Sequence, residues 1–211
     1  MKRIFLWVLV VILILLSLDS PQGLIFPLGI VVYLFKDKFA VLLGKIPLPV
    51  AFMLSGLLFG LMTESFAILE NLDAPPEQKI LLHPNPAVDL FMGAFYYGMF
   101  ILAWFLLLRK YSFSKKAVFI ISGIFGLFTE QQGAVLDGIV ANPLLGLIMA
   151  FLIMSVYGLF PLLAYMLTEE RFNDRQKPTV RHYVFAALAL FLFWAIYGNF
   201  VHKWLLIVFP K

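Results

Sequence analysis

Residues 48–70, LPVAFMLSGLLFGLMTESFAILE, decide the fold class of this chain. The stretch contains no lysine or arginine, and its only charged residues are Glu64 and Glu70. A helix of about 20 predominantly apolar residues is long enough to cross the hydrocarbon core of a bilayer. The stretch therefore predicts a membrane-spanning helix that carries a carboxyl group well inside the apolar run.

The rest of the chain has the same character. Its 211 residues are 63% hydrophobic and 13% charged, with a mean hydropathy of +0.97. Soluble domains are about 45–50% apolar and about 25% charged, so the composition predicts an all-α integral membrane protein with a single transmembrane domain. The net charge of +4 comes from loops between spans and does not indicate nucleic-acid binding. The absence of cysteine excludes disulfides, thiolate metal ligands and a cysteine nucleophile.

About seven spans are expected, at residues 4–18, 23–35, 48–70, 87–108, 117–137, 143–167 and 183–208. The first follows Lys2 and Arg3 as in a signal peptide, but no good cleavage site follows it, so we interpret it as an uncleaved span. The second is short and contains Pro27, which indicates a tilted or re-entrant segment.

Basic residues gather in alternate loops, between spans two and three, four and five, and six and seven. The opposite loops, residues 19–22, 71–86 and 138–142, carry few of them. Lysine and arginine are enriched in the cytoplasmic loops of membrane proteins. The pattern predicts a cytoplasmic N-terminus and a C-terminus on the opposite side.

An internal repeat connects these spans. The string SGLLFGLMTE at residues 55–64 returns, with one leucine deleted, as SGIFGLFTE at residues 122–130. Both copies continue to a second acid, to Asn-Pro and to Tyr-Gly-x-Phe; these are Glu70 and Asp137, Asn85-Pro86 and Asn142-Pro143, and Tyr97–Phe100 and Tyr157–Phe160. We therefore predict duplication of a two-helix unit, with repeat 1 in 47–111, repeat 2 in 112–172, N-terminal spans in 1–46 and a C-terminal span in 173–211. Because a two-helix unit keeps its orientation when copied, the halves should be related by an axis along the membrane normal.

Glu64 and Glu130 are the strongest candidates for a function. A charged side chain inside a membrane helix costs roughly 2.5–3.5 kcal/mol and is by default a functional-site hypothesis. Facing each other, the two carboxyl groups could share a proton or hold one cation, with the hydroxyls of Thr63 and Thr129 beside them. The alternative is that each glutamate hydrogen-bonds a neighbouring helix and only fixes its packing.

The remaining polar candidates lie near the predicted outer face. Glu70 and Asp137 either extend the ion-binding site or face water at the ends of their spans. His83 and His202 are expected on the same side, either as catalytic partners of Glu64 and Glu130 or as interfacial residues. Carboxylates and imidazole are also ligands of divalent metals, although no HExxH or similar motif and no cofactor motif is evident. The candidate metal ligands are Glu64, Glu130, Asp137 and His202.

Small and aromatic residues suggest how the helices approach one another. Gly56 and Gly60, with Ser122 and Gly126 at the matching positions and the pair Ala94 and Gly98, have the spacing that allows close helix packing. Four tyrosines could either pack or present hydroxyls to a cavity near the glutamates; they are Tyr96, Tyr97, Tyr157 and Tyr197.

Three functions remain open at the level of sequence. The first is a small transporter or channel that binds a cation or protons at the intramembrane glutamates. The second is an intramembrane hydrolase or transferase for a lipid or lipid-linked substrate, with the loop 71–86 as a lid. The third is a non-catalytic subunit whose acids bind helices of a membrane-protein partner or of a second copy. The lipid bilayer is a partner in all three, and nucleic acid in none.

Overall fold

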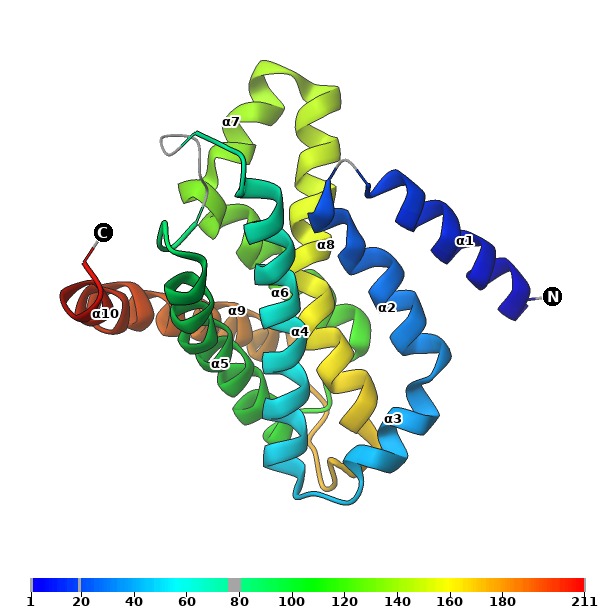
Figure 1. Cartoon of the computed structure of the whole chain (residues 1–211). Coiled ribbons are helices and arrows are strands. Elements are labelled where there is room, and N and C mark those ends of the chain that lie inside the picture. The colour runs from blue at the N-terminus through cyan, green and yellow to red at the C-terminus, as the bar shows by residue number, and fades with distance from the viewer. Residues whose placement is uncertain (1, 19, 76–80, 211) are drawn as a thin grey trace.

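The computed structural model describes residues 2–18, 20–75 and 81–210, and helices dominate these ranges (Figure 1). The long and medium helices are α1 (Lys2–Leu16), α2 (Ile25–Leu34), α3 (Lys36–Leu43), α4 (Leu48–Asn71), α5 (Pro86–Lys110), α6 (Lys115–Thr129), α7 (Ala134–Ala141), α8 (Pro143–Thr168), α9 (Val180–Ile196) and α10 (Lys203–Val208). Short turns connect them, namely the 3-10 turns η1 (Pro21–Leu24), η3 (Glu130–Gly133) and η4 (Glu169–Arg171) and the π-helical segment η5 (Tyr197–His202).

Four continuous helical stretches in the described part of the chain are long and apolar enough to cross a membrane. They are α4, α5, α8 with η4, and α9 with η5 and α10. A fifth candidate is formed by α6 and α7 together, which are bent by 84° at η3. The chain is therefore an all-helical protein with four to five candidate membrane spans.

The first two predicted spans are helical but short. Helix α1 has 15 residues, and η1 with α2 covers only Pro21–Leu34. At 1.5 Å per residue, α1 is about 22 Å long, less than the roughly 30 Å of a hydrocarbon core. In Figure 1, α1 lies at the edge of the molecule, where it contacts η1 and α2, and Val10 is its one buried side chain.

The central bundle consists of α4, α5, α6 and α8, with α9 packed on α5 and α6 (Figure 1). An aromatic core joins three of these helices, because the Phe100 ring lies 5.0 Å from Phe125 and 5.0 Å from Phe160 between ring centroids. Beside it, the indole N–H of the buried Trp104 donates to Ser122 Oγ at 2.8 Å. The two predicted repeats thus share one core.

The duplicated Asn-Pro dipeptide begins a helix in both halves. Asn85 Oδ1 accepts a hydrogen bond from Ala87 N at 3.0 Å, and Asn142 Oδ1 accepts one from Leu145 N at 3.3 Å. An asparagine cap followed by proline in the first turn is a strong start signal for a helix. This signal explains why α5 and α8 begin close to the predicted positions.

Small residues make the expected close contacts in α4 and α6. A Cβ atom added to Gly56 would lie 2.5 Å from Ile101 Cδ1, and one added to Gly60 or Gly126 would lie 2.5 Å from a tyrosine ring of the neighbouring helix. Such contacts let helix backbones approach closely. The same expectation is wrong at Gly98, where an added Cβ meets nothing within 4 Å.

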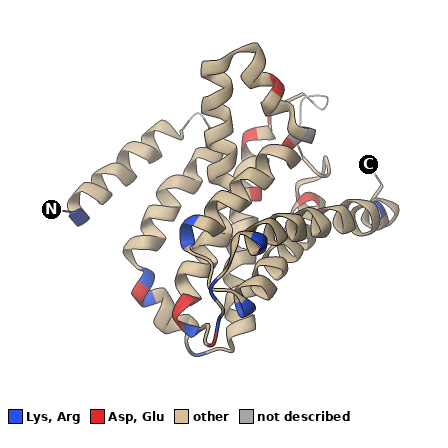
Figure 2. Ribbon diagram, turned by 180° about the vertical axis from the view of Figure 1, so that it is seen from behind, with Lys and Arg blue, Asp and Glu red and all other residues tan. Residues whose placement is uncertain are grey.

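Charged residues separate along the bundle. Figure 2 shows most of the basic segments at one end of the bundle and most of the acidic segments in the other half. At the basic end, Arg171 donates to the carbonyl oxygens of Leu43 at 2.9 Å and Ile46 at 2.6 Å, and Lys115 forms a 2.6 Å ion pair with Glu169. These contacts tie α3, α6 and η4 together at that end. A surface hollow of about 350 Å³ beside Arg109 and Lys110 also lies there, away from the acidic half.

Candidate functional site

Glu64 and Glu130 each accept a hydrogen bond from a tyrosine. Tyr97 Oη donates to Glu64 Oε2 at 2.7 Å, and Tyr157 Oη donates to Glu130 Oε2 at 2.6 Å. Short O–H···O contacts of this kind are among the stronger hydrogen bonds in proteins. In both cases the tyrosine belongs to the Tyr-Gly-x-Phe element of the same predicted repeat as the glutamate.

A glycine positions each tyrosine ring. Gly60 precedes Glu64 by four residues and Gly126 precedes Glu130 by four, so each glycine lies one turn below its acid on the same helix face. The rings of Tyr97 and Tyr157 lie directly against these glycines, because an added Cβ would come within 2.5 Å of a ring carbon. The ring therefore packs on the glycine while the hydroxyl reaches the acid.

The two halves differ in backbone at the acid. Glu64 lies within the continuous helix α4, but α6 ends at Thr129 and Glu130 has an extended conformation, with φ −65° and ψ 121°. The predicted span 117–137 is therefore not a single straight helix but is bent by 84° between α6 and α7. The chain turns at η3, where Gly133 takes a φ of +85°, a conformation that glycine adopts without steric cost. Glu130 thus lies at a helix break.

Asp89 is a third acid that the sequence did not single out. It lies in the first turn of α5, is fully buried, and accepts a hydrogen bond from His83 N at 2.8 Å through Oδ1. Its other oxygen, Oδ2, is buried and has no hydrogen-bond partner in the described part of the chain. The Glu64 side chain lies nearby, because a Cβ added to Gly93, one turn after Asp89 on α5, would come 3.3 Å from Glu64 Cγ, and the two carboxyl groups interact electrostatically.

Two further tyrosines connect these groups. The Tyr96 ring lies 5.3 Å from Tyr97 and 5.3 Å from Tyr197, and its hydroxyl lies near the side chains of Tyr157 and Thr129. Glu64 also interacts electrostatically with Glu130. The structure therefore joins both halves in one carboxyl–tyrosine cluster, which consists of Glu64, Asp89, Glu130, Tyr96, Tyr97, Tyr157 and Tyr197.

The cluster adjoins a very small cavity. It has a volume of about 10 Å³, which is about the space needed for one water molecule. Tyr96 and Tyr197 contribute polar side chains to it, and the other lining residues are apolar or aromatic. Tyr197 is held in place by a 3.2 Å hydrogen bond from its hydroxyl to the Met92 carbonyl oxygen, at the start of the π-helical segment η5. Single π-helical turns of this kind occur frequently at functional sites.

The hydroxyl groups of Thr63 and Thr129 donate hydrogen bonds to carbonyl oxygens of their own helices. Thr63 Oγ1 donates to the carbonyl oxygen of Phe59 at 2.9 Å, and Thr129 Oγ1 donates to that of Phe125 at 3.0 Å. This four-residue back-bond is the usual way for a threonine to satisfy its hydroxyl inside a helix. Of the two, Thr129 also reaches the cluster, through Tyr96.

Glu70 and Asp137 lie outside the cluster. Glu70 is exposed, and its Oε2 accepts hydrogen bonds from Ser20 Oγ and Gln22 N, both at 3.0 Å. It thus ties the end of α4 to the start of η1. Asp137 is exposed in the first turn of α7, where an acid complements the positive end of a helix.

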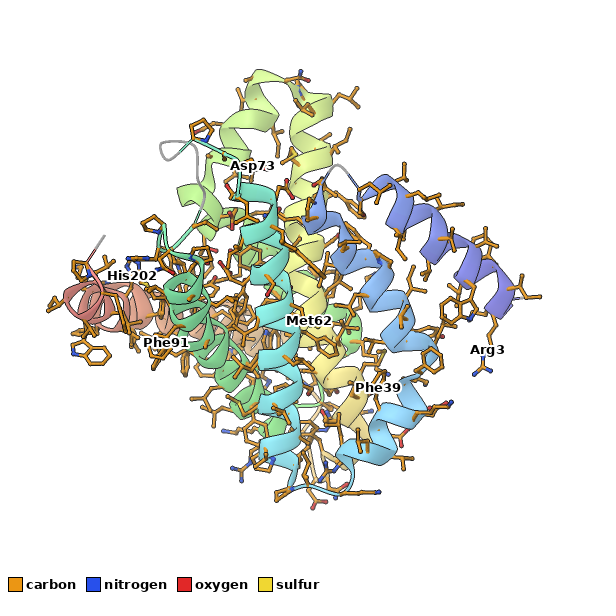
Figure 3. All side chains as sticks on the ribbon, viewed as in Figure 1. Arg3, Phe39, Met62, Asp73, Phe91 and His202 are labelled. Atoms are coloured by element: carbon orange, nitrogen blue, oxygen red, sulfur yellow. The ribbon has the colours of Figure 1, made fainter. Side chains whose placement is uncertain are left out.

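The histidines support the cluster from its edge. His83 is buried, its Nδ1 accepts from Asn85 N at 3.0 Å, and its Nε2 lies 3.4 Å from the Pro210 carbonyl oxygen. The His202 ring lies 5.8 Å from that of Tyr197, and Figure 3 shows His202 on the same side of the molecule as Phe91 of α5. Within the described residues, no three His, Asp or Glu side chains are grouped closely enough to hold a metal ion. The metal site remains a prediction.

None of the three acids forms an ion pair with a basic side chain of the described residues. The groups that act on Glu64 are Asp89, Tyr97 and Glu130, and none of them is basic. Over residues 2–18, 20–75 and 81–210, the one ion pair within 4 Å is Lys115 with Glu169, at the opposite end of the bundle. Three carboxyl groups therefore share a largely buried region without a basic partner in the described part of the chain.

The chain matches no protein-family model and has no significant match among curated proteins or solved structures. The chemistry of the carboxyl–tyrosine cluster is therefore the basis on which a function can be inferred.

Proposed function

We propose that this protein is a small membrane transporter or channel that binds a proton or another cation at Glu64 and Glu130. The observation that carries the proposal is the group of acids without a basic partner in the described residues. An ionised carboxylate is costly in an apolar interior unless a positive charge compensates it. A proton or a cation supplies that charge, and its reversible binding is the elementary step of transport.

Tyrosine side chains connect Glu64 and Glu130 along the proposed proton pathway. Tyr97 and Tyr157 each donate a hydrogen bond to one glutamate, and Tyr96 lies between these two tyrosine–glutamate pairs. A hydroxyl can accept one hydrogen bond while it donates another, so a row of tyrosines can pass a proton between acids. In this proposal Glu64 and Glu130 are the two binding stations and Tyr96 connects them.

Seven spans and the parallel duplication form part of the same proposal. The repeated arrangement of glycine, glutamate and tyrosine in both halves supports the duplication. The basic end of the bundle would face the cytoplasm, with the N-terminus on that side and the C-terminus on the other. Helices α1 and α2 would then be short spans at the edge of the bundle.

The contacts of His83 give less support to an enzymatic function than the acids give to transport. Both ring nitrogens of His83 lie next to main-chain atoms, those of Asn85 and Pro210, which leaves the ring little freedom to act as an acid or a base. Residues 76–80 of the predicted lid lie outside the described residues. We therefore do not propose an enzymatic function.

Proton flux into proteoliposomes tests the proposal. Purified protein is reconstituted with a trapped pH-sensitive dye, and a potassium diffusion potential drives positive charge inward. Wild type should acidify the lumen, whereas Glu64→Gln and Glu130→Gln should each abolish the flux because an amide does not titrate. Glu170→Gln, an exposed glutamate in η4, should behave as wild type.

Three results would contradict this expectation or redirect it. Unchanged flux in both glutamine variants, or no flux in wild type with any tested cation, would contradict transport through the acids. A stoichiometric metal in wild type that is lost in the double variant would identify the cation as that metal. Failure of Glu64→Gln to accumulate in the membrane would favour the packing role and a subunit of a larger complex.

A further inference from the structure

We propose that Glu64 and Asp89 form a two-carboxyl site that holds one shared proton. This inference rests on the proposed function and deepens it, because it names the ligand of the first binding station as a proton. It also makes Asp89, which has no counterpart among the residues predicted from the sequence, part of the binding site.

The hydrogen-bonding capacity of the pair supports the shared proton. Asp89 is fully buried and uses Oδ1 for the His83 N–H, whereas Oδ2 has no partner among the described residues. The Glu64 side chain packs against Gly93, one turn after Asp89 on α5, since a Cβ added there would lie 3.3 Å from Glu64 Cγ. Glu64 already accepts a hydrogen bond from Tyr97 through Oε2. Ionised carboxylates only accept hydrogen bonds, so two of them cannot satisfy each other. One proton converts Asp89 or Glu64 into a donor and gives the unpaired oxygen its partner.

No basic side chain of the described residues forms an ion pair with either acid. The titratable side chains that face the pair come from α5, η3, η5 and the segment before α5; they are Tyr96, Tyr97, Glu130, Tyr197 and His83. Tyrosine and glutamate carry no positive charge, and the His83 ring is directed to the main chain of Asn85 and Pro210. Two carboxylates that share such a site cannot both keep their charge, as in the acid pair of aspartic proteases.

The second half of the molecule lacks this pair. Asp89 stands three residues after Pro86, and the residue three after Pro143 is Gly146. A Cβ added to Gly146 would collide with backbone atoms of Ile139 and Gly138, so the α7 backbone fills the corresponding space. The two stations are therefore chemically different, with a carboxyl pair at Glu64 and a glutamate without such a partner at Glu130. This difference gives a proton a preferred station.

Infrared spectroscopy of protonated carboxyl groups tests the pair without any transport assay. Wild-type protein in lipid nanodiscs at neutral pH should show a protonated carboxyl C=O band that shifts in heavy water. Asp89→Asn should lose this band and stay folded, because the asparagine amide can donate to Glu64 in place of the proton while its oxygen still accepts from His83. Glu64→Gln should lose the same band, and Glu130→Gln and the exposed control Asp73→Asn should retain it.

Each outcome separates this inference from the proposed function. A band that persists unchanged in both Asp89→Asn and Glu64→Gln would overturn the shared proton, even if wild type carries protons. Loss of the band in both variants from a protein without flux would confirm the pair and contradict transport. A stoichiometric metal ion in wild type, lost in Asp89→Asn and without a protonated carboxyl band, would overturn the proton in favour of a metal.

Discussion

Gly60 shows how a single residue can define the site. It carries no chemistry, yet its missing side chain leaves the space in which the Tyr97 ring lies, and that ring directs a hydroxyl to Glu64. Gly126 has the same role for Tyr157 and Glu130. At each acid, the packing and the hydrogen bond therefore depend on three residues, namely the glycine, the tyrosine and the glutamate itself.

Gly60→Ala should destabilise the protein, because the added methyl group must displace the Tyr97 ring. Overpacking of this kind costs about 1–3 kcal/mol. The matched control is Gly98→Ala in α5, where the new methyl group meets nothing within 4 Å and an alanine favours the helix. Thermal unfolding of both variants in detergent checks the prediction, and equal melting temperatures would contradict the proposed packing of Tyr97.

Several residues could be predicted from the sequence, and others could not, for physical reasons. Glu64 and Glu130 stand out because acids are rare in apolar runs, and the shared Tyr-Gly element already included their donors. Asp89 did not stand out, because an acid in the first turn of a helix is an ordinary stabilising feature. Its burial depends on tertiary contacts with Glu64 and His83, which a single sequence does not encode locally.

At the level of elements, long apolar stretches were predictable and breaks were not. The expected spans 48–70, 87–108, 143–167 and 183–208 correspond to α4, α5, α8 and the stretch from α9 to α10. The bend between α6 and α7 was missed because the apolar pattern continues on both sides of it. The local signal was the polar sequence Glu130-Gln-Gln-Gly133, and the glycine in it takes the left-handed conformation.

Gly133→Ala should weaken this break. An L-residue in the left-handed region costs roughly 1–2 kcal/mol, so the variant should unfold at a lower temperature than wild type. Gly138→Ala in α7 is the control, since it lies in a regular helix and its new methyl group has open space. If Gly133→Ala is as stable as Gly138→Ala, residues 130–133 do not require the turn seen here.

At the scale of the whole molecule, the basic and acidic segments gather in different halves of the bundle. Asp73 follows the end of α4 and lies in the acidic half, and Figure 3 shows it at the end of the bundle opposite to Phe39 of α3. The basic segments of the loop before α9 lie at the other end, as Figure 2 shows. The positive-inside rule predicts that these two ends lie on opposite sides of a membrane.

Single cysteines at Asp73 and Lys177 should therefore react with a membrane-impermeant maleimide from opposite sides. The chain has no cysteine of its own, so each label reports one exposed position. We expect Lys177→Cys to be labelled in inside-out vesicles and Asp73→Cys in right-side-out vesicles. Labelling of both from one side would contradict the proposed topology.

The shared aromatic core has a consequence for the history of the molecule. Phe100 of the first half packs against Phe125 and Phe160 of the second, and Trp104 donates to Ser122 across the same boundary. If the halves arose by duplication, the ancestral single unit exposed this surface and would have met a second copy of itself, as a homodimer. In that case, fusion of the two genes would have allowed each half to diverge, so that a carboxylate such as Asp89 could arise in one half alone.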